Sequence, residues 1–245
     1  MKKNICGILI DDSDRRTLIH EIEQRLKEQR RTVIYTPNPI MAQNAKKDEY
    51  FMKILNSSDY NVPDGNGIIL ASRLLNTPIP KRICGIELAE DLLKIAAQKQ
   101  YRIFLYGGRE GVAALAAKKL SVRYPNLKIC GVANGFINDS VAFERIKRSS
   151  PDAVYVCLGS PKQEKWIYEN APRLRHTKLF MGLGGSLDVW SESVARAPAK
   201  IRSLGFEWLW RMAVAPKRLK DLPKLVTFGA STLLKSLSNV GIMHR

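Results

Sequence analysis

A single acidic side chain, Asp64, lies in the segment Val62-Pro63-Asp64-Gly65-Asn66-Gly67, between an expected strand and an expected helix. The proline fixes the incoming chain, and the two glycines permit tight backbone paths. A turn of this kind places an acid at the carboxyl edge of a sheet, where α/β proteins carry out their chemistry. An ordinary loop aspartate would account for the same residues, so the turn alone leaves both interpretations open.

The segment Thr36-Pro37-Asn38-Pro39 follows another expected strand. Its two prolines force an extended backbone around Asn38. Thr36 and Asn38 then offer a hydroxyl and an amide at the carboxyl end of the strand. The alternative is a proline-stiffened loop with a helix N-cap, which this segment taken alone favours.

Glycines follow three more expected strands. Gly107 and Gly108 occupy the position of a phosphate cradle, where free backbone N–H groups favour an anion. A full G-x-G-x-x-G motif and its later acidic residue are missing, which argues against NAD and leaves a nucleotide diphosphate site or a plain tight turn. Gln163 lies in the first turn of the helix expected after the strand at 153–158, and its side chain could reach a ligand. Gly185 either lets the backbone approach a ligand or allows close helix–sheet packing.

Short apolar runs and amphipathic stretches alternate between these segments. We expect strands at 5–10, 33–35, before 62, and at 102–106, 128–132, 153–158 and 178–183, with helices at 14–29, 46–56, 66–75, 87–99, 110–123, 139–149 and from about 162 to 170. This alternation predicts a Rossmann-like α/β fold, with a mostly parallel sheet covered by helices on both faces. The candidate segments should then meet at one rim of the sheet.

The composition changes near Ser193. From residue 196 the chain has no convincing strand, is strongly basic and contains interleaved aromatic residues. We predict an α/β catalytic domain at 1–195 and a basic helical appendage at 196–245, broken at Pro216 and Pro223. Apolar residues of the appendage fall near one helical face, which favours contact with a membrane; a helix docked on the core is the alternative. They are Leu225, Phe228, Leu233, Leu234 and Leu237.

The chain has 245 residues and a net charge of +17. Such a charge attracts polyanions, namely nucleic acid, an anionic membrane face or a phosphorylated substrate. The four cysteines are widely separated and resemble reduced core thiols, which suits a cytosolic protein and argues against a zinc site. No apolar run has the length of a signal peptide core or a membrane span, so we expect any membrane contact to be peripheral.

Eight sequence blocks, in order along nearly the whole chain, resemble the WecG/TagA/CpsF glycosyltransferase family, glycosyltransferase family 26. They are T-P-N-P at 36–39, V-P-D-G-N-G at 62–67, K-R-I-C-G at 81–85, Y-G-G-R at 106–109, G-S-P-K-Q-E at 159–164, G-L-G-G-S-L-D-V at 182–189, R-A-P at 196–198 and G-F-E-W-L-W-R at 205–211. One block could arise by chance, but eight in order could not.

The resemblance implies a metal-independent, inverting transfer of a sugar from a UDP-sugar donor to a polyprenyl-diphosphate-linked sugar. It implies a site on the cytoplasmic face of a bacterial membrane, where the protein would bind peripherally to the anionic surface. The type most similar adds N-acetylmannosamine to undecaprenyl-diphosphate N-acetylglucosamine in teichoic-acid linkage-unit synthesis. Relatives that use glucose or N-acetylmannosaminuronic acid, in capsule, exopolysaccharide or common-antigen synthesis, are the alternative. A homo-oligomer is compatible with the sequence.

Carried over by position, Asp64 resembles the general base of the family. Thr36, Asn38 and Gln163 resemble polar residues of the active site, and Arg82 of the K-R-I-C-G block is a candidate anion contact. The tail arginines Arg211 and Arg218 are candidates to contact the UDP diphosphate. Lysines replace some arginines that the family carries after P-x-R-L, and lysine is a point charge without the arginine fork. The cluster Asp11-Asp12-Ser13-Asp14 reads as a helix cap and not as a D-x-D metal site.

Three other classes of function compete with this interpretation. A nucleic-acid-binding protein would explain the charge and the aromatic residues, but not the grouped strand ends. A non-catalytic membrane scaffold would leave Asp64 dispensable. A nucleotide-dependent oxidoreductase is disfavoured by the incomplete glycine motif after Tyr106.

Overall fold

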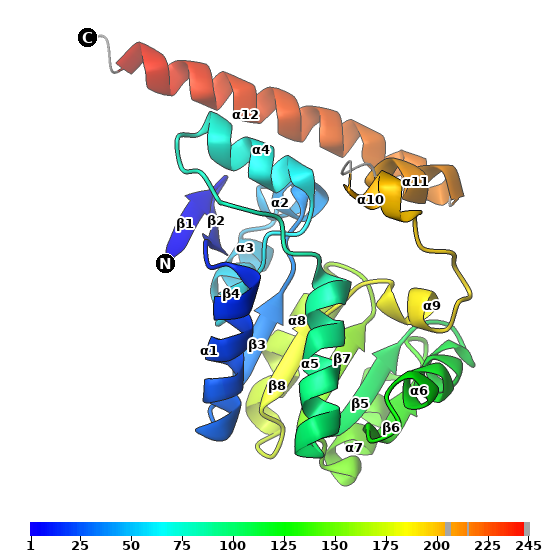
Figure 1. Ribbon diagram of the computed structural model, residues 1–245. Helices are drawn as coiled ribbons and strands as arrows, with labels where there is room; N and C mark the ends of the chain where they lie inside the picture. Colours follow the sequence, from blue (N-terminus) through cyan, green and yellow to red (C-terminus); the bar gives the residue numbers. More distant parts are fainter. Residues whose placement is uncertain (204–206, 215, 243–245) are drawn as a thin grey trace.

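The computed structural model describes residues 1–203, 207–214 and 216–242 (Figure 1), without the side chains at 199, 203, 208, 211, 214, 216–218 and 239–242. Six strands form one sheet in the order β4-β3-β8-β7-β5-β6. They are β3 (Thr32–Tyr35), β4 (Tyr60–Asn61), β5 (Arg102–Gly107), β6 (Lys128–Ala133), β7 (Ala153–Cys157) and β8 (Leu179–Gly182). Every neighbouring pair is parallel, so all six carboxyl ends lie at one rim.

Helices cover both faces of the sheet, which confirms the predicted fold class. Strand residues alternate between two buried clusters, so that Ile103 and Leu105 face one side while Phe104 and Tyr106 face the other. The first cluster includes residues of α1 (Arg15–Lys27), α5 (Gly85–Lys99) and α6 (Val112–Arg123), and the second those of α3 (Glu49–Asn56), α7 (Asp139–Ser149) and α8 (Lys162–Asn170). Strand β7 is buried along its whole length, as expected for a central parallel strand.

The N-terminus differs from the single strand predicted at 5–10. It forms a separate hairpin of β1 (Lys2–Ile5) and β2 (Ile8–Asp11), paired antiparallel. The two turn residues, Cys6 and Gly7, have φ angles of 54° and 96°. Two positive φ values suit the tight turn of a hairpin, and Cys6 is not a residue type that normally signals one.

A short helix, α2 (Pro39–Ala45), was not predicted as an element, but it confirms the alternative of a helix N-cap in the 36–39 segment. Asn38 caps it, because its side-chain oxygen accepts hydrogen bonds from the N–H groups of Ile40 and Met41 at 3.0 Å each. Pro39 lies at the first helical position, where the missing N–H costs nothing. The helix predicted at 46–56 begins later, at Glu49. Helix α4 (Asn66–Leu74), η1 (Ala171–Arg173) and α9 (Ser186–Trp190) complete the first part of the chain.

The last part of the chain is helical, with α10 (Ala199–Ser203), α11 (Glu207–Val214), η2 (Pro216–Asp221) and α12 (Leu222–Ile242). The appendage is broken at both predicted positions, because η2 begins at Pro216 and α12 begins next to Pro223, which lies in its first turn, where proline is tolerated. Helix α12 packs against α2 and α4, beyond the carboxyl rim of the sheet (Figure 1). Among the helices described, none combines the length and apolarity needed to cross a bilayer.

Candidate active site

Backbone hydrogen bonds join three segments beyond the strand ends and so build the site. The N–H of Val62 donates to the carbonyl of Tyr35 at 2.8 Å, and the N–H of Asp64 donates to that of Pro37 at 3.1 Å. The N–H of Ile83 donates to the carbonyl of Pro63 at 3.0 Å. The loop after β3, the loop after β4 and the segment before α5 therefore run side by side, which brings Thr36, Asp64 and Arg82 into one region.

Two glycines allow this close approach. A Cβ atom at Gly67 would lie 2.5 Å from Cγ of Pro39, and one at Gly85 would lie 2.8 Å from Cγ2 of Thr36. A side chain at Gly67 would push α4 away from Pro39 at the start of α2, and one at Gly85 would push α5 away from Thr36. Gly85 thus allows Thr36 to lie against the start of α5, and Gly67 allows Pro39 to lie against the start of α4.

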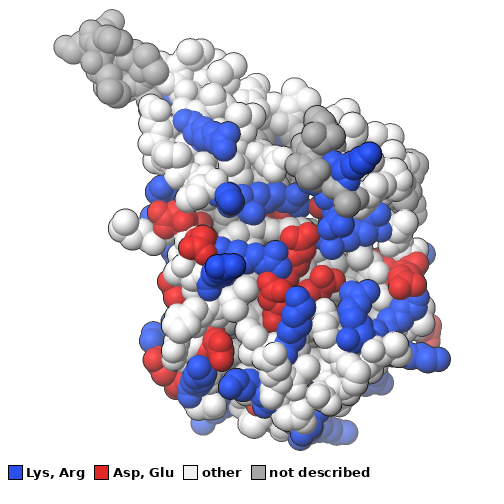
Figure 2. Space-filling model, viewed as in Figure 1, with Lys and Arg blue, Asp and Glu red and all other residues white. Residues whose placement is uncertain are grey.

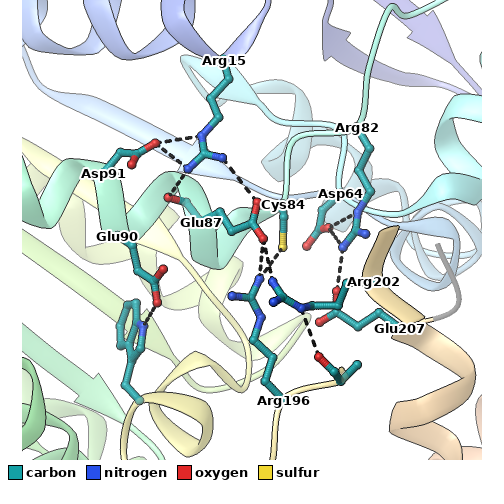
Figure 3. Close-up of polar contacts among 12 residues, drawn as sticks. Arg15, Asp64, Arg82, Cys84, Glu87, Glu90, Asp91, Arg196, Arg202 and Glu207 are labelled. Carbon is teal, nitrogen blue, oxygen red and sulfur yellow. Dashed lines mark hydrogen bonds and ion pairs between the residues drawn. The ribbon is translucent and has the colours of Figure 1, made fainter. Parts of the chain in front are cut away.

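Arg82 links Asp64 to the appendage (Figure 3). Its Nε and Nη2 atoms each donate to Oδ1 of Asp64 at 3.2 Å, and Nη2 also donates to Oε2 of Glu207, in α11, at 3.0 Å. Burial opposes the charge on Arg82, but the Asp64 carboxylate, followed by smaller contributions that include Glu207, outweighs it and raises the pKa of the guanidinium. Arg82 therefore stays positively charged and binds two carboxylates, one from the α/β domain and one from the appendage.

A second ionic cluster holds the start of the appendage on α5. The guanidinium groups of Arg196 and Arg202 donate to Oε1 of Glu87 at 2.7 and 3.2 Å. Arg15, from α1, contacts Oε2 of the same glutamate at 3.3 Å (Figure 3). Burial, and then the nearby Asp64 carboxylate, raises the pKa of the adjacent Cys84 thiol to about 11, so this thiol stays protonated near neutral pH.

A cleft of about 1030 Å³ opens in front of this ionic network. Thr36, Asn38, Asp64 and Arg82 all line it, so four of the predicted site residues come together. The remaining lining comes mainly from α4, α11 and α12, which face the strand-end loops across the cleft. This volume is in the range expected for small-molecule sites.

Gly107, Gly108, Gln163 and Gly185 lie at the same rim but outside the lining of the cleft. Gln163 is buried: its Nε2 donates to Oε1 of Glu164 at 2.6 Å and its Oε1 accepts the N–H of Gly184 at 2.8 Å. These bonds give Gln163 a role in holding the loop that leads to Gly185. The N–H of Gly108 donates to the carbonyl of Cys157 at 3.2 Å, and Gly107 passes too close to that carbonyl to carry a side chain.

The side chains of Arg211 and Arg218 lie outside the described part of the structure, although their backbones belong to α11 and η2.

The N-terminal acidic residues have local roles. Asp14 caps α1 through the N–H groups of Arg16 and Thr17, as predicted. Asp11 is buried and accepts the N–H of Asn61 at 2.7 Å, and burial raises its pKa to about 6.

Four charged residues of the cleft were not predicted as site residues, namely Arg73, Lys81, Glu207 and Asp221. Glu207 and Asp221 are the two acidic residues in the basic stretch from 196 to 245. An isolated acid in a strongly basic segment is a usable signal, since it indicates a specific partner for a cation. No comparable signal marks Arg73, whose position in the cleft depends on how α12 packs on α4.

A sequence profile described as "Glycosyl transferase WecG/TagA/CpsF family" matches residues 3–239. A protein of Bacillus subtilis (strain 168) is 39% identical over 224 residues, which span 90% of this chain and 84% of the relative. A protein of Staphylococcus aureus (strain NCTC 8325 / PS 47) is 33% identical over 231 residues, with 93% and 90% covered. Both relatives are named N-acetylglucosaminyldiphosphoundecaprenol N-acetyl-beta-D-mannosaminyltransferase.

Proposed function

The chain belongs to the WecG/TagA/CpsF family of glycosyl transferases, and from this premise we propose that it moves N-acetylmannosamine from UDP-N-acetylmannosamine to undecaprenyl-diphosphate-linked N-acetylglucosamine. The names of the relatives support the sugar and the acceptor. The observation that carries the proposal within this molecule is the convergence of Thr36, Asn38, Asp64 and Arg82 on one cleft at the carboxyl rim.

Asp64 is the general base of the proposed reaction. Its carboxylate accepts the proton of the acceptor hydroxyl as that oxygen bonds to the anomeric carbon of the donor sugar. The bond from the anomeric carbon to the UDP oxygen breaks, UDP leaves with the electron pair, and the configuration inverts. Base catalysis of this kind contributes on the order of 10²–10⁴-fold in rate. Arg82 orients the carboxylate through the two hydrogen bonds to Oδ1.

The departing UDP carries negative charge, which cations of the cleft are suited to stabilise. Arg82, Arg73 and Lys81 line the cleft. We place Arg211 and Arg218 in the same role, since α11 and η2, to which they belong, also contribute Met212 and Asp221 to the lining of the cleft. In this mechanism the diphosphate is neutralised by side chains, so the reaction requires no metal ion.

The acceptor is a membrane lipid, and so the proposal places the protein peripherally on the cytoplasmic face of the membrane. Basic residues near an anionic lipid surface contribute roughly 1 kcal/mol each. The net charge of +17 and the basic appendage support this location.

Transfer to undecaprenyl-diphosphate N-acetylglucosamine, with a panel of UDP-sugars and product mass as the readout, tests the function. We expect N-acetylmannosamine to be transferred; a clear preference for UDP-glucose or the UDP-linked uronic acid would replace the donor but keep the reaction type. The Asp64→Asn variant should lose about 10²–10⁴-fold in turnover and still bind UDP. Undiminished turnover by this variant would refute the base role.

A further inference from the structure

The cleft has a polar part and an apolar part. Asp64, Arg82 and the strand-end loops form the polar part, whereas the facing side is made by apolar residues from three helices. They are Ile69, Leu70 and Leu74 of α4, Met212 of α11, and Leu225 and Phe228 of α12. This side of the cleft is suited to a ligand with a hydrocarbon portion, because such a ligand would remove the apolar side chains from water.

Helix α12 carries two apolar faces. Phe228 is buried in the protein, among the residues that pack on α2 and α4. Leu222, Val226, Leu233 and Leu237 are exposed, and their spacing places them along one side of the helix. We call these four residues the exposed stripe. An exposed apolar stripe on an appendage helix normally contacts another apolar phase.

The apolar part of the cleft is continuous with the exposed stripe. Leu222 and Val226 belong to both, because each lines the cleft and is also exposed. Leu70 of α4 also lines the cleft, and 59% of its surface is accessible to solvent. The cleft therefore opens between α4 and α12, beside side chains that are suited to hydrocarbon.

Cations line the cleft on both sides, since Lys81 and Arg82 belong to the polar part and Arg73 belongs to α4. Arg73, Lys81 and Arg82 line the cleft and suit a diphosphate group. Figure 2 shows charged side chains gathered below α4 and few over α12. The cleft thus matches an amphiphile whose anionic head lies near Asp64 and whose apolar chain extends toward the exposed stripe.

We propose that the groove between α4 and α12 binds the isoprenoid chain of the acceptor lipid, which leaves the cleft past Leu70 and Val226 toward the bilayer. This inference rests on the proposed function and extends it, because it assigns the lipid-binding site in part to α4, outside the appendage. The diphosphate lies against the cations of the cleft, and the sugar hydroxyl reaches Asp64.

Acceptor chain length provides the test. We compare farnesyl-linked and undecaprenyl-linked acceptors in detergent micelles, with the Leu70→Ser and Val226→Ser variants. Removal of buried apolar contact should lower kcat/KM for the undecaprenyl acceptor by about tenfold, with a clearly smaller change for the farnesyl acceptor. Leu237→Ser is the matched control, since Leu237 is exposed on the same stripe but does not line the cleft. It should weaken binding to anionic vesicles and leave both micelle values unchanged.

Equal losses for both acceptors, or no loss in either variant, would overturn the proposal. Binding of undecaprenyl diphosphate and farnesyl diphosphate to the same proteins, measured without a donor, gives a readout independent of transfer. Weaker binding of the longer lipid alone supports the groove even if the wild-type protein transfers no sugar. Absence of sugar transfer by the wild-type protein would reject the proposed function and not the lipid site.

Discussion

Addition of one methyl group at Gly85 tests whether the contact between α5 and the loop after β3 positions the site. A Cβ atom there would lie 2.8 Å from Cγ2 and 3.3 Å from Cβ of Thr36, whereas ordinary contact begins at 3.4 Å. Thr36 is β-branched, so its side chain has little freedom to turn away. We expect the Gly85→Ala variant to separate Thr36 from α5 by about 0.6 Å or more.

A displacement of this size should affect turnover more than folding. A shift of about 1 Å in a reacting group can lower the rate by about 10²-fold, and overpacking costs roughly 1–3 kcal/mol of stability. We therefore expect kcat/KM to fall by about ten- to a hundredfold, with a modestly lower Tm. Initial rates of transfer and thermal unfolding, measured on the same preparation, give both values.

Gly131→Ala is the matched control. Its Cβ would lie 2.5 Å from Cε2 of Phe104, in β5, and Gly131 does not line the cleft. This variant should lose stability to a similar degree but keep wild-type kcat/KM per folded molecule. Wild-type kcat/KM in Gly85→Ala, or equal losses in the two variants, would show that the contact with Thr36 does not position the site.

Two further predictions concern charged groups. Glu207→Gln should lower kcat/KM by about tenfold in the transfer assay, because Arg82 loses a charged partner. Asp221→Asn is the control, since Asp221 is also an acidic residue of the appendage that lines the cleft. Equal losses in the two variants would contradict a specific role for the contact between Arg82 and Glu207. Burial raises the pKa of Asp11 from 3.8 to about 6, so the folded protein binds this proton more tightly than the unfolded chain and loses stability as the pH rises between these values. In the Asp11→Asn variant, the free energy of unfolding measured in urea should depend less on pH over that interval. An unchanged pH dependence would disprove the assignment.

The periodic elements could be predicted from sequence because their burial is local to each strand or helix. The helix at 139–149 and the strands at 102–107 and 153–157 match the predictions closely, since the apolar runs of the strands and the periodic pattern of the helix have clear boundaries. The hairpin at Cys6 was missed because cysteine does not normally signal a positive φ angle. The N-cap of α2 was recognised as an alternative, but the helix itself was missed because seven residues give little periodicity.

The polar part of the site was also predictable, because parallel strands must end at one rim. Thr36, Asn38, Asp64 and Arg82 lie together for this reason. The apolar part was not, since it depends on which side of α12 packs against α4. Helical periodicity groups Leu225, Phe228 and Leu233 loosely, but only tertiary packing separates the buried Phe228 from the exposed Leu233.

Phe228 shares a buried cluster with Met41 of α2 and Ile68 of α4, and the Thr232 side chain is also almost wholly enclosed. Truncation of the chain before α12 would uncover these apolar side chains to water. Shortened forms of the protein should therefore associate with one another or precipitate through this newly bared surface. Their loss of activity would then reflect an incompletely packed hydrophobic core as much as a missing catalytic group. Point substitutions are therefore the sounder way to study the appendage.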